Sequence, residues 1–175
     1  MSEVANAPSA PIRIGVIADT HLAGRPEDHR FLAGLAARHF LGAAMILHAG
    51  DIVAPGLLSA FLPTPVYAVR GNMDPASGET PPKRVIHVGG LRIGLIHGWG
   101  APAGIVERIL PEFAATPLDC LVFGHTHMPC CQRLGDLLLF NPGSVTDRRR
   151  MAYESVGLLE IENGRIHGRI IPLDT

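Results

Sequence analysis

Three short apolar segments, each followed closely by a polar side chain, constrain the fold of this chain more than any other feature. They are IRIGVIA at 12–18, AMILHAG at 44–50 and PVYAVRG at 65–71. Short apolar runs rich in β-branched residues that stop at a polar or glycine-containing loop are typical of buried strands. We therefore expect three buried strands in the first half of the chain.

Helical patterns lie between these strands. Apolar residues at helical spacing predict a helix before Gly42, and a shorter helix is expected after Pro55, near residues 57–61. The order strand, helix, strand, helix, strand predicts a parallel sheet with crossover helices. The residues that carry the first helical pattern are Phe31, Leu32, Leu35 and Ala36.

The second half of the chain has a different pattern. Gly89 and Gly90 separate two apolar runs in RVIHVGGLRIGLIH, which predicts a hairpin. A helix is expected from residue 103 to residue 110, and another buried strand at 118–124. Further hairpins are expected at the pairs Gly135-Asp136 and Asn163-Gly164. The sheets should therefore mix parallel and antiparallel pairs.

Length and composition fit one compact domain. The chain has 175 residues, of which 47% are hydrophobic, enough to fill a core. Residues 1–11 are small, polar and free of periodicity, so we expect a flexible tail there and a single domain over residues 12–175.

Charge and cysteine content exclude several classes of partner and site. The formal net charge is -1, which provides no basic field for a stable nucleic-acid complex or an acidic membrane. No apolar run approaches the roughly 20 residues of a membrane span, and no signal peptide is evident, so we expect a cytoplasmic protein. Cys120, Cys130 and Cys131 form neither a disulfide framework nor a paired zinc motif, and we expect buried, reduced thiols.

Residues able to bind a metal follow the ends of the predicted strands. Because the carboxyl ends of parallel strands lie at one edge of a sheet, these side chains can converge although they are far apart in sequence. Two of the pairs have i, i+2 spacing, which in extended backbone would point both side chains to one side as a clamp. Glycine adjoins many of these positions and permits tight turns. The candidate ligands are Asp19, His21, Asp51, Asn72, His97, His125 and His127.

The ligand types indicate which metals such a site could hold. Imidazole, carboxylate and amide groups without thiolates suit Mn, Fe, Co, Ni or Zn, and of these we favour Mn. Seven candidate ligands exceed the needs of one ion, so we expect two divalent metal ions per subunit. Asp51 has two oxygens and stands alone on its loop, which favours it as the bridging ligand.

The ordered motifs D19-x-H21, G50-D51, G71-N72, H97 and G124-H125-x-H127 resemble those of the calcineurin-like metallophosphoesterase family. The segments GNMD at 71–74 and NPGS at 141–144 are closer to its short bacterial and archaeal phosphodiesterase branch. The resemblance implies an α/β fold: a four-layer α/β/β/α sandwich with two mixed β-sheets.

The same resemblance implies roles for single residues. Asp19, His21 and His127 would bind one metal, Asn72, His97 and His125 the other, and Asp51 would bridge. The catalytic group would then comprise Asn72, Asp51 and His97, with Asn72 stabilising the charge that develops on phosphorus.

The expected reaction is attack of a metal-bridging hydroxide on a small anionic phosphoester, most simply a phosphodiester. A phosphomonoesterase or nucleotide phosphatase is the alternative activity. A non-catalytic, protein-binding scaffold is the alternative class, since the retromer scaffold subunit resembles this fold but lacks ligand histidines. The sequence leaves a homo-oligomer open. Larger family members carry a histidine where this chain has Met73, which has no proton to donate.

Other polar residues are more simply explained as structural. Asp74 and Asn141 are expected to fix loops, and His48 to support the site from behind. Arg148, Arg149 and Arg150 read as a solvated loop, although they could contact phosphate. Trp99 reads as a packing residue with base stacking as the alternative. The histidines without an expected role are His29, His39, His87 and His167.

Overall fold

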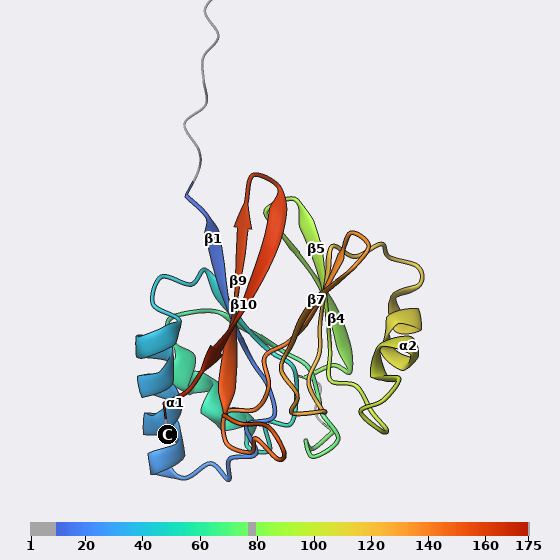
Figure 1. Cartoon of the computed structure of the whole chain (residues 1–175). Coiled ribbons are helices and arrows are strands. Elements are labelled where there is room, and N and C mark those ends of the chain that lie inside the picture. The colour runs from blue at the N-terminus through green and yellow to red at the C-terminus, as the bar shows by residue number, and fades with distance from the viewer. Residues whose placement is uncertain (1–9, 77–79, 175) are drawn as a thin grey trace, which may run out of the picture.

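The computed structural model describes residues 10–76 and 80–174 (Figure 1). Most of the expected tail at residues 1–11 therefore lies outside the described residues. Two five-stranded sheets face each other. The first has the strand order β10 (Arg165–Pro172), β9 (Ser155–Glu162), β1 (Ile12–Ile17), β2 (Met45–His48) and β3 (Val66–Ala68). The second has the order β4 (Lys83–Val88), β5 (Leu91–Ile96), β6 (Cys120–Val122), β8 (Leu137–Asn141) and β7 (Cys130–Leu134).

Both sheets are mixed, as expected from the sequence. β1, β2 and β3 pair in parallel, as do β5, β6 and β8, while β9, β10, β4 and β7 are antiparallel to their neighbours. The three expected hairpins join β4 to β5, β7 to β8 and β9 to β10. Gly89 and Gly90 both have positive φ (58° and 79°), which the tight turn between β4 and β5 requires.

Three apolar clusters show that the molecule has four layers. Val16, Leu95 and Phe140 belong to the cluster buried between the two sheets. Helix α1 (Pro26–His39) and the 3₁₀ helix η1 (Pro55–Phe61) cover the outer face of the first sheet through the second cluster. Helix α2 (Ile105–Ile109) and the 3₁₀ helix η2 (Leu110–Phe113) cover the second sheet through the third. Figure 1 shows the two groups of helices on opposite sides of the paired sheets. The α/β/β/α sandwich is confirmed.

Local chemistry explains where the helices begin and end. Asp28 accepts the backbone N–H groups of Gly24 and Arg25 at 3.1 and 2.9 Å, which fixes the start of α1 at Pro26. Leu32 and Leu35 are buried as expected.

The helices lie where the sequence predicts them, with three differences in detail. Phe31 is 43% exposed, so it lies at the rim of the apolar stripe that buries Leu32 and Leu35. The short helix after Pro55 is a 3₁₀ helix. The helix expected over 103–110 is α-helical only from Ile105 to Ile109, because Pro111 cannot donate a backbone hydrogen bond and the chain continues as the 3₁₀ turn η2.

The cysteines are free but not all buried. Cys120 is buried in β6, Cys130 is half-buried and Cys131 is exposed. The expectation of buried thiols was therefore wrong for Cys131, because β7 is an edge strand of the second sheet. Among the residues that the structure describes, no helix combines the length and apolar character needed to cross a bilayer.

Phe140 connects the two sheets where glycines leave room for its ring. A Cβ atom on Gly157 of β9 would lie 2.3 Å from a ring carbon of Phe140, and one on Gly168 of β10 would lie 2.7 Å away. We predict that Gly157→Ala lowers the free energy of unfolding by roughly 1–3 kcal/mol through overpacking. Gly34→Ala in α1, where a Cβ meets nothing within 4 Å, should instead raise it by about 0.5–1 kcal/mol. Urea titrations of both variants test this, and an unchanged midpoint for Gly157→Ala would contradict the packing argument.

Candidate metal centre

The candidate ligands leave the strands at one end of the sandwich. Asp19, Asp51 and Asn72 follow β1, β2 and β3 in the first sheet, whereas His97 follows β5 and the pair His125 and His127 follows β6 in the second. The sequence pattern suggested the edge of one parallel sheet. That picture is corrected: the seven residues come from both sheets, whose parallel segments end on the same side (Figure 1).

Backbone hydrogen bonds bring these loops together. The N–H of Asp19 donates to the carbonyl of Gly50 at 3.0 Å, and the N–H of His21 donates to the carbonyl of Asp51 at 3.1 Å. Within the second sheet, the N–H of Gly124 donates to the carbonyl of His97 at 3.1 Å. The strand ends are thus joined within each sheet before any side chain contributes.

The expected clamps with extended backbone are wrong. Asp19, His21, His125 and His127 have φ values of 51°, 47°, 68° and 59°, in the left-handed region, as does Asp51 at 54°. The chain turns sharply at each of these positions, so side chains two residues apart need not point the same way. The second pair divides: the Nε2 of His127 lies 3.5 Å from Asp19, whereas the Nδ1 of His125 faces the Oδ1 of Asn72 at 3.0 Å.

Glycine permits this crowding at particular points. A Cβ atom on Gly71 would lie 2.1 Å from Oδ1 of Asp51, and one on Gly124 would lie 3.0 Å from Oδ2 of Asp19. Only a residue without a side chain lets the loops approach the carboxylates this closely.

Asp19 and Asp51 are two buried carboxylates in one cluster, with side chains 0% and 3% exposed. Asp19 accepts the N–H of His125 at 2.9 Å, and Asp51 accepts the N–H of Met73 at 2.8 Å. Burial raises the pKa of Asp19 to about 7, an effect that the charge of Asp51 adds to and that of His97 opposes. Burial also opposes ionisation of Asp51, but the hydrogen bond and charge of His97 outweigh it and lower the pKa of Asp51.

Three histidines are oriented by backbone carbonyls. His97 lies with Nδ1 2.7 Å from the carbonyl of Ala49, and His127 with Nδ1 2.6 Å from that of Asp147. The Nε2 of His125 lies 2.9 Å from the carbonyl of Gly100. A carbonyl only accepts, so each of these nitrogens carries the proton. When a ring is neutral, its opposite nitrogen is a lone pair directed into the site, the arrangement typical of metal-binding histidines.

These nitrogens face side-chain oxygens or the nitrogen of another imidazole. The Nε2 of His97 lies 3.2 Å from Oδ1 of Asn72 and 3.4 Å from Oδ1 of Asp51. The Nε2 of His127 lies 3.2 Å from the Nε2 of His21. Two acceptors at hydrogen-bond distance repel each other unless a proton or a cation lies between them. The donor set therefore fits divalent metal ions, and two groups of ligand atoms lie within 4.8 Å of one another: Asp19, His21 and His127, and Asp19, Asp51 and His97.

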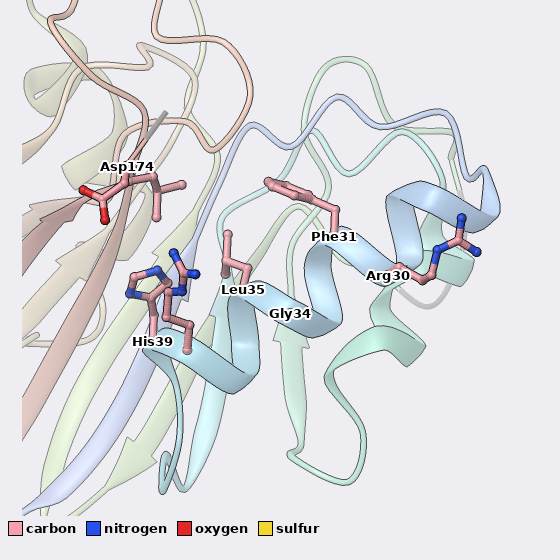
Figure 2. Close-up of a pocket in the computed structure, with 8 residues that line it drawn as sticks. Arg30, Phe31, Gly34, Leu35, His39 and Asp174 are labelled. Atoms are coloured by element: carbon pink, nitrogen blue, oxygen red, sulfur yellow. The ribbon is translucent and has the colours of Figure 1, made fainter.

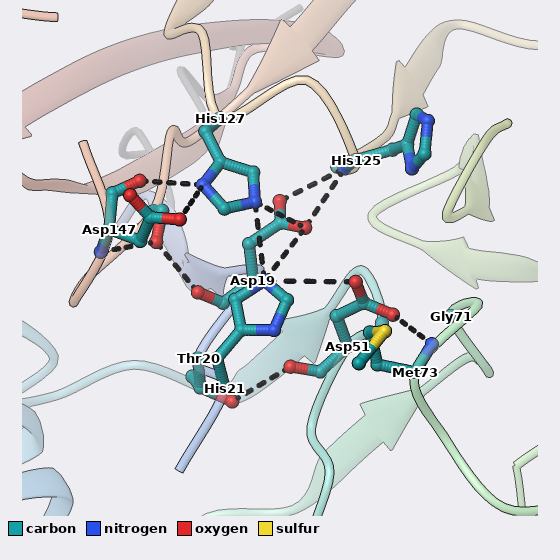
Figure 3. Close-up of polar contacts among 12 residues, drawn as sticks. Asp19, Thr20, His21, Asp51, Gly71, Met73, His125, His127 and Asp147 are labelled. Carbon is teal, nitrogen blue, oxygen red and sulfur yellow. Dashed lines mark hydrogen bonds and ion pairs between the residues drawn. The ribbon is translucent and has the colours of Figure 1, made fainter. Parts of the chain in front are cut away.

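Both carboxylates reach both groups of histidines. Asp51 lies 3.7 Å from Nε2 of His21 through Oδ2 and 3.4 Å from Nε2 of His97 through Oδ1. The Oδ1 of Asp19 lies 4.0 Å from the same nitrogens of His21 and of His97. Figure 3 shows Asp19 between His127, His125 and Asp51. Each carboxylate could therefore serve an ion held by either group of histidines.

The three supporting residues from the sequence fix the surrounding loops. Asp74 accepts the N–H groups of Val53 at 2.6 Å and of Gly71 at 2.7 Å, so it joins two ligand loops. Asn141 donates to the carbonyl of Gly124 at 3.0 Å, just before His125.

His48 supports the centre through a chain of hydrogen bonds. Its Nδ1 accepts the N–H of Gly50 at 3.2 Å, and its Nε2 meets the hydroxyl of Thr20 at 3.3 Å, which in turn donates to the carbonyl of Asp51. Burial lowers the pKa of His48 to about 4, so the ring stays neutral in this role.

Sequence reasoning missed Thr20, Ser144 and Asp147. The hydroxyl of Ser144 donates to the carbonyl of Asp19 at 2.7 Å, and Asp147 holds His127 through its carbonyl. Ser144 lies in the NPGS segment and could have been proposed from it. The contacts of Asp147 to His127 and of His125 to Gly100 use backbone carbonyls, which leave no residue-specific trace in a sequence.

The remaining sequence candidates are placed as follows. Trp99 is 45% exposed and lines a cavity with Asn72 and His97, so it is not a packing residue. Arg148, Arg149 and Arg150 are exposed, and Arg149 lines a second cavity with Thr126. A third cavity, on α1 (Figure 2), is lined by His39 and Asp174 among others and shares no residue with the candidate centre.

Comparison with known proteins points to one family. The chain matches the family model described as the calcineurin-like phosphoesterase superfamily domain over residues 12–164. A probable metallophosphoesterase from Methanothermobacter thermautotrophicus is 37% identical over 160 residues, which cover 90% of this chain and 91% of that protein. The phosphodiesterase YfcE of Escherichia coli is 34% identical over 104 residues, 54% of this chain and 52% of YfcE.

Similar solved structures include Vps29 from Entamoeba histolytica in complex with Zn²⁺. Its TM-score with this chain is 0.67 at 24% sequence identity, with 93% of this chain and 100% of that one covered. At this level of identity the likeness shows the fold alone.

We predict that the stability the protein gains from metal binding depends on pH through the protonation of Asp19. Its folded-state pKa of about 7 lies above the ordinary value of 3.8, so the metal-free fold binds an extra proton and loses stability as pH rises between these values. A cation displaces that proton, so apparent affinity should rise by up to about tenfold per pH unit below pH 7 for each proton displaced. Thermal melts with chelator and with Mn²⁺ should show the metal-dependent gain in Tm growing from pH 5 to pH 8.

Asp19→Asn provides the control, because it keeps the size of the side chain and removes the titrating group. Its metal-free stability should lose most of this pH dependence. If the wild-type gain in Tm from Mn²⁺ is the same at pH 5 and pH 8, the linkage through Asp19 is wrong.

Proposed function

We propose that this chain, which belongs to the calcineurin-like phosphoesterase superfamily, hydrolyses phosphodiester bonds at a centre of two divalent metal ions. The observation that carries the proposal is the set of three histidines, each bound to a backbone carbonyl through one nitrogen and directing the other at buried carboxylates or Asn72. We assign Asp19, His21 and His127 to one ion, Asn72, His97 and His125 to the other, and Asp51 to both, with manganese as the favoured metal.

When bound, such ions supply a water-derived nucleophile near neutral pH and neutralise charge on the phosphoryl group. The chain's own residues determine where this happens. The Oδ1 of Asn72 is turned toward His97 and His125, so its amide N–H₂ is left to donate to a phosphoryl oxygen. Asn72 is exposed at the edge of the centre, which allows that contact.

Two cavities next to the centre favour a diester over a monoester. One is lined by Asn72, His97 and Trp99, and the other by Pro102, Thr126 and Arg149. A phosphodiester carries two substituents on phosphorus and can place one in each cavity, whereas a monoester has only one to place. A phosphomonoesterase or nucleotide phosphatase remains the alternative activity, and rates with matched diesters and monoesters decide between them.

The alternative of a protein-binding scaffold is addressed by activity rather than by metal content. The Vps29 of Entamoeba histolytica has a structure with Zn²⁺, so metal binding alone does not separate the two classes. All seven candidate ligand positions are filled by residues able to bind metal in this chain, which favours catalysis. Hydrolysis of bis(p-nitrophenyl) phosphate that is lost with chelator and restored by Mn²⁺ is the direct test, and no turnover with any ester would overturn the proposal.

We predict different metal losses for two substitutions. Asp51→Asn weakens a ligand that faces both histidine groups, so it should reduce Mn²⁺ bound per subunit from two toward zero. His21→Ala removes a ligand from one group and should leave about one. The residual kcat of Asp51→Asn should be at least about tenfold below that of His21→Ala.

Elemental analysis after gel filtration measures the stoichiometry. His87→Ala, on the exposed side of β4, is the matched control and should keep two ions. Loss of one ion in both ligand variants would argue against Asp51 as the bridge.

Met73 predicts how rates depend on the leaving group. Its side chain is 58% exposed and cannot donate a proton, and its N–H is occupied by Asp51. The leaving oxygen then departs without an acid, so rates should fall steeply from nitrophenyl to alkyl leaving groups. Met73→His should raise alkyl ester rates by roughly 10² to 10⁴, the usual effect of a general acid, and affect nitrophenyl esters far less.

A series of phenyl esters of graded acidity measures this slope in single-turnover experiments. An equal change for alkyl and nitrophenyl esters in Met73→His would mean that another residue supplies the proton.

A further inference from the structure

Arg70 is a half-buried cation whose guanidinium has no partner among the residues that the structure describes. Its backbone N–H donates to the carbonyl of Pro81 at 2.9 Å, but within residues 10–76 and 80–174 no hydrogen bond or ion pair engages its side chain. A partly desolvated charge without a partner is costly, so it favours an anionic ligand.

Arg70 lies in the cavity that adjoins the candidate centre. This cavity has a volume of about 500 Å³ and is lined by Arg70, Asn72, His97 and Trp99, with Lys83 and Glu112 at its wall. Two of these residues are proposed metal ligands. A group bound here can therefore be part of a molecule whose phosphate sits at the metals.

Arg70 carries the uncompensated charge among the described residues that line this cavity. The Nζ of Lys83 is paired with the carboxylate of Glu112 at 2.9 Å and lies 5.6 Å above the ring of Phe113. Because Lys83 and Glu112 neutralise each other, the cavity has a net positive charge from Arg70. The cavity is therefore selective for negative charge rather than merely polar.

Trp99 forms a fixed wall of the same cavity. The residue is 45% exposed, while its carbonyl accepts the Nε–H of Arg108 at 3.0 Å. Arg108 also donates to the carbonyls of Ala101 and Ala103, and His125 binds the carbonyl of Gly100. The loop that presents the indole is thus held at Trp99 and at the residues that follow it.

We propose that Arg70 and Trp99 form a subsite for an ester substituent that carries a second anionic group. The reacting phosphate occupies the metal centre, the chain of the substituent crosses the face of Trp99, and its terminal carboxylate or phosphate pairs with Arg70. The inference rests on the proposed function, because the substituent reaches the subsite only from a phosphoester bound at the metals.

Binding of two matched ligands tests the subsite directly. Trp99 is the single tryptophan of the chain, so its fluorescence reports occupation of this cavity. The probes are 3-carboxypropyl methylphosphonate and butyl methylphosphonate, which share the phosphonate monoanion and differ in the terminal charge. With the Zn²⁺-loaded full chain at low ionic strength, we expect the carboxylate ligand to bind roughly tenfold more tightly.

Arg70→Gln should remove this preference while leaving the affinity for the butyl ligand unchanged within about twofold. Arg30→Gln is the matched control, since Arg30 lies in the separate cavity on α1 and its loss changes the net charge equally. Circular dichroism confirms that both variants are folded. The preference should also weaken at high salt, as expected for a partly exposed ion pair.

Equal affinities for the two ligands in the wild type, or a preference that persists in Arg70→Gln, would overturn the subsite. Hydrolysis of bis(p-nitrophenyl) phosphate, measured on the same preparations, separates this failure from failure of the proposed function. If that hydrolysis is intact, only the subsite is lost; if no ester is hydrolysed at any metal concentration, the proposed function itself falls.

Discussion

The arrangement of the loops in this structure depends on two carboxylates that are buried in one cluster. Asp19 and Asp51 lie where the ends of two sheets meet, and both are almost inaccessible to water. Like charges in such a place repel each other and lose hydration, which is why the pKa of Asp19 rises on burial. Backbone N–H groups of His125 and Met73 and the imidazole of His97 reduce the cost, but they do not balance two negative charges. The surrounding loops are arranged around that deficit of positive charge.

The fold could largely be predicted from the sequence because its information is local. Short apolar runs identify the strands, paired glycines such as Gly89 and Gly90 identify hairpins, and the ordered ligand motifs identify the family and hence the four layers. The division of the strands into two sheets could not be read from spacing, because parallel pairing of β5, β6 and β8 depends on contacts between distant segments. The exposure of Phe31 could not be predicted either. Its spacing is helical, but packing decides which residues of the helix are buried.

The candidate site was predictable in its members but not in its geometry. Side-chain type and order were enough to select the seven residues that the structure brings together. Their backbone conformation was not predicted, because a D-x-H or H-x-H motif does not indicate a left-handed φ at Asp19 or His127. The strain of those positions is sustained by hydrogen bonds such as that from Asp19 to Gly50, which join loops 31 residues apart. The sequence also gives no signal for the role of the loop after β5. Within three residues of His97 this loop provides Trp99 and the carbonyl of Gly100, which holds His125.

The carbonyls that orient His97, His125 and His127 belong to Ala49, Gly100 and Asp147. Every amino acid has a carbonyl, so a substitution at such a position changes the side chain without deleting the group that aims the imidazole. The orientation of the nitrogens that face the candidate site is therefore insensitive to many point mutations that would disable a ring held by a neighbouring carboxylate. Sequence changes that alter such a site should instead be insertions and deletions that shift a loop. Redesign of the metal preference of the site would have to alter loop length rather than the identity of one supporting residue.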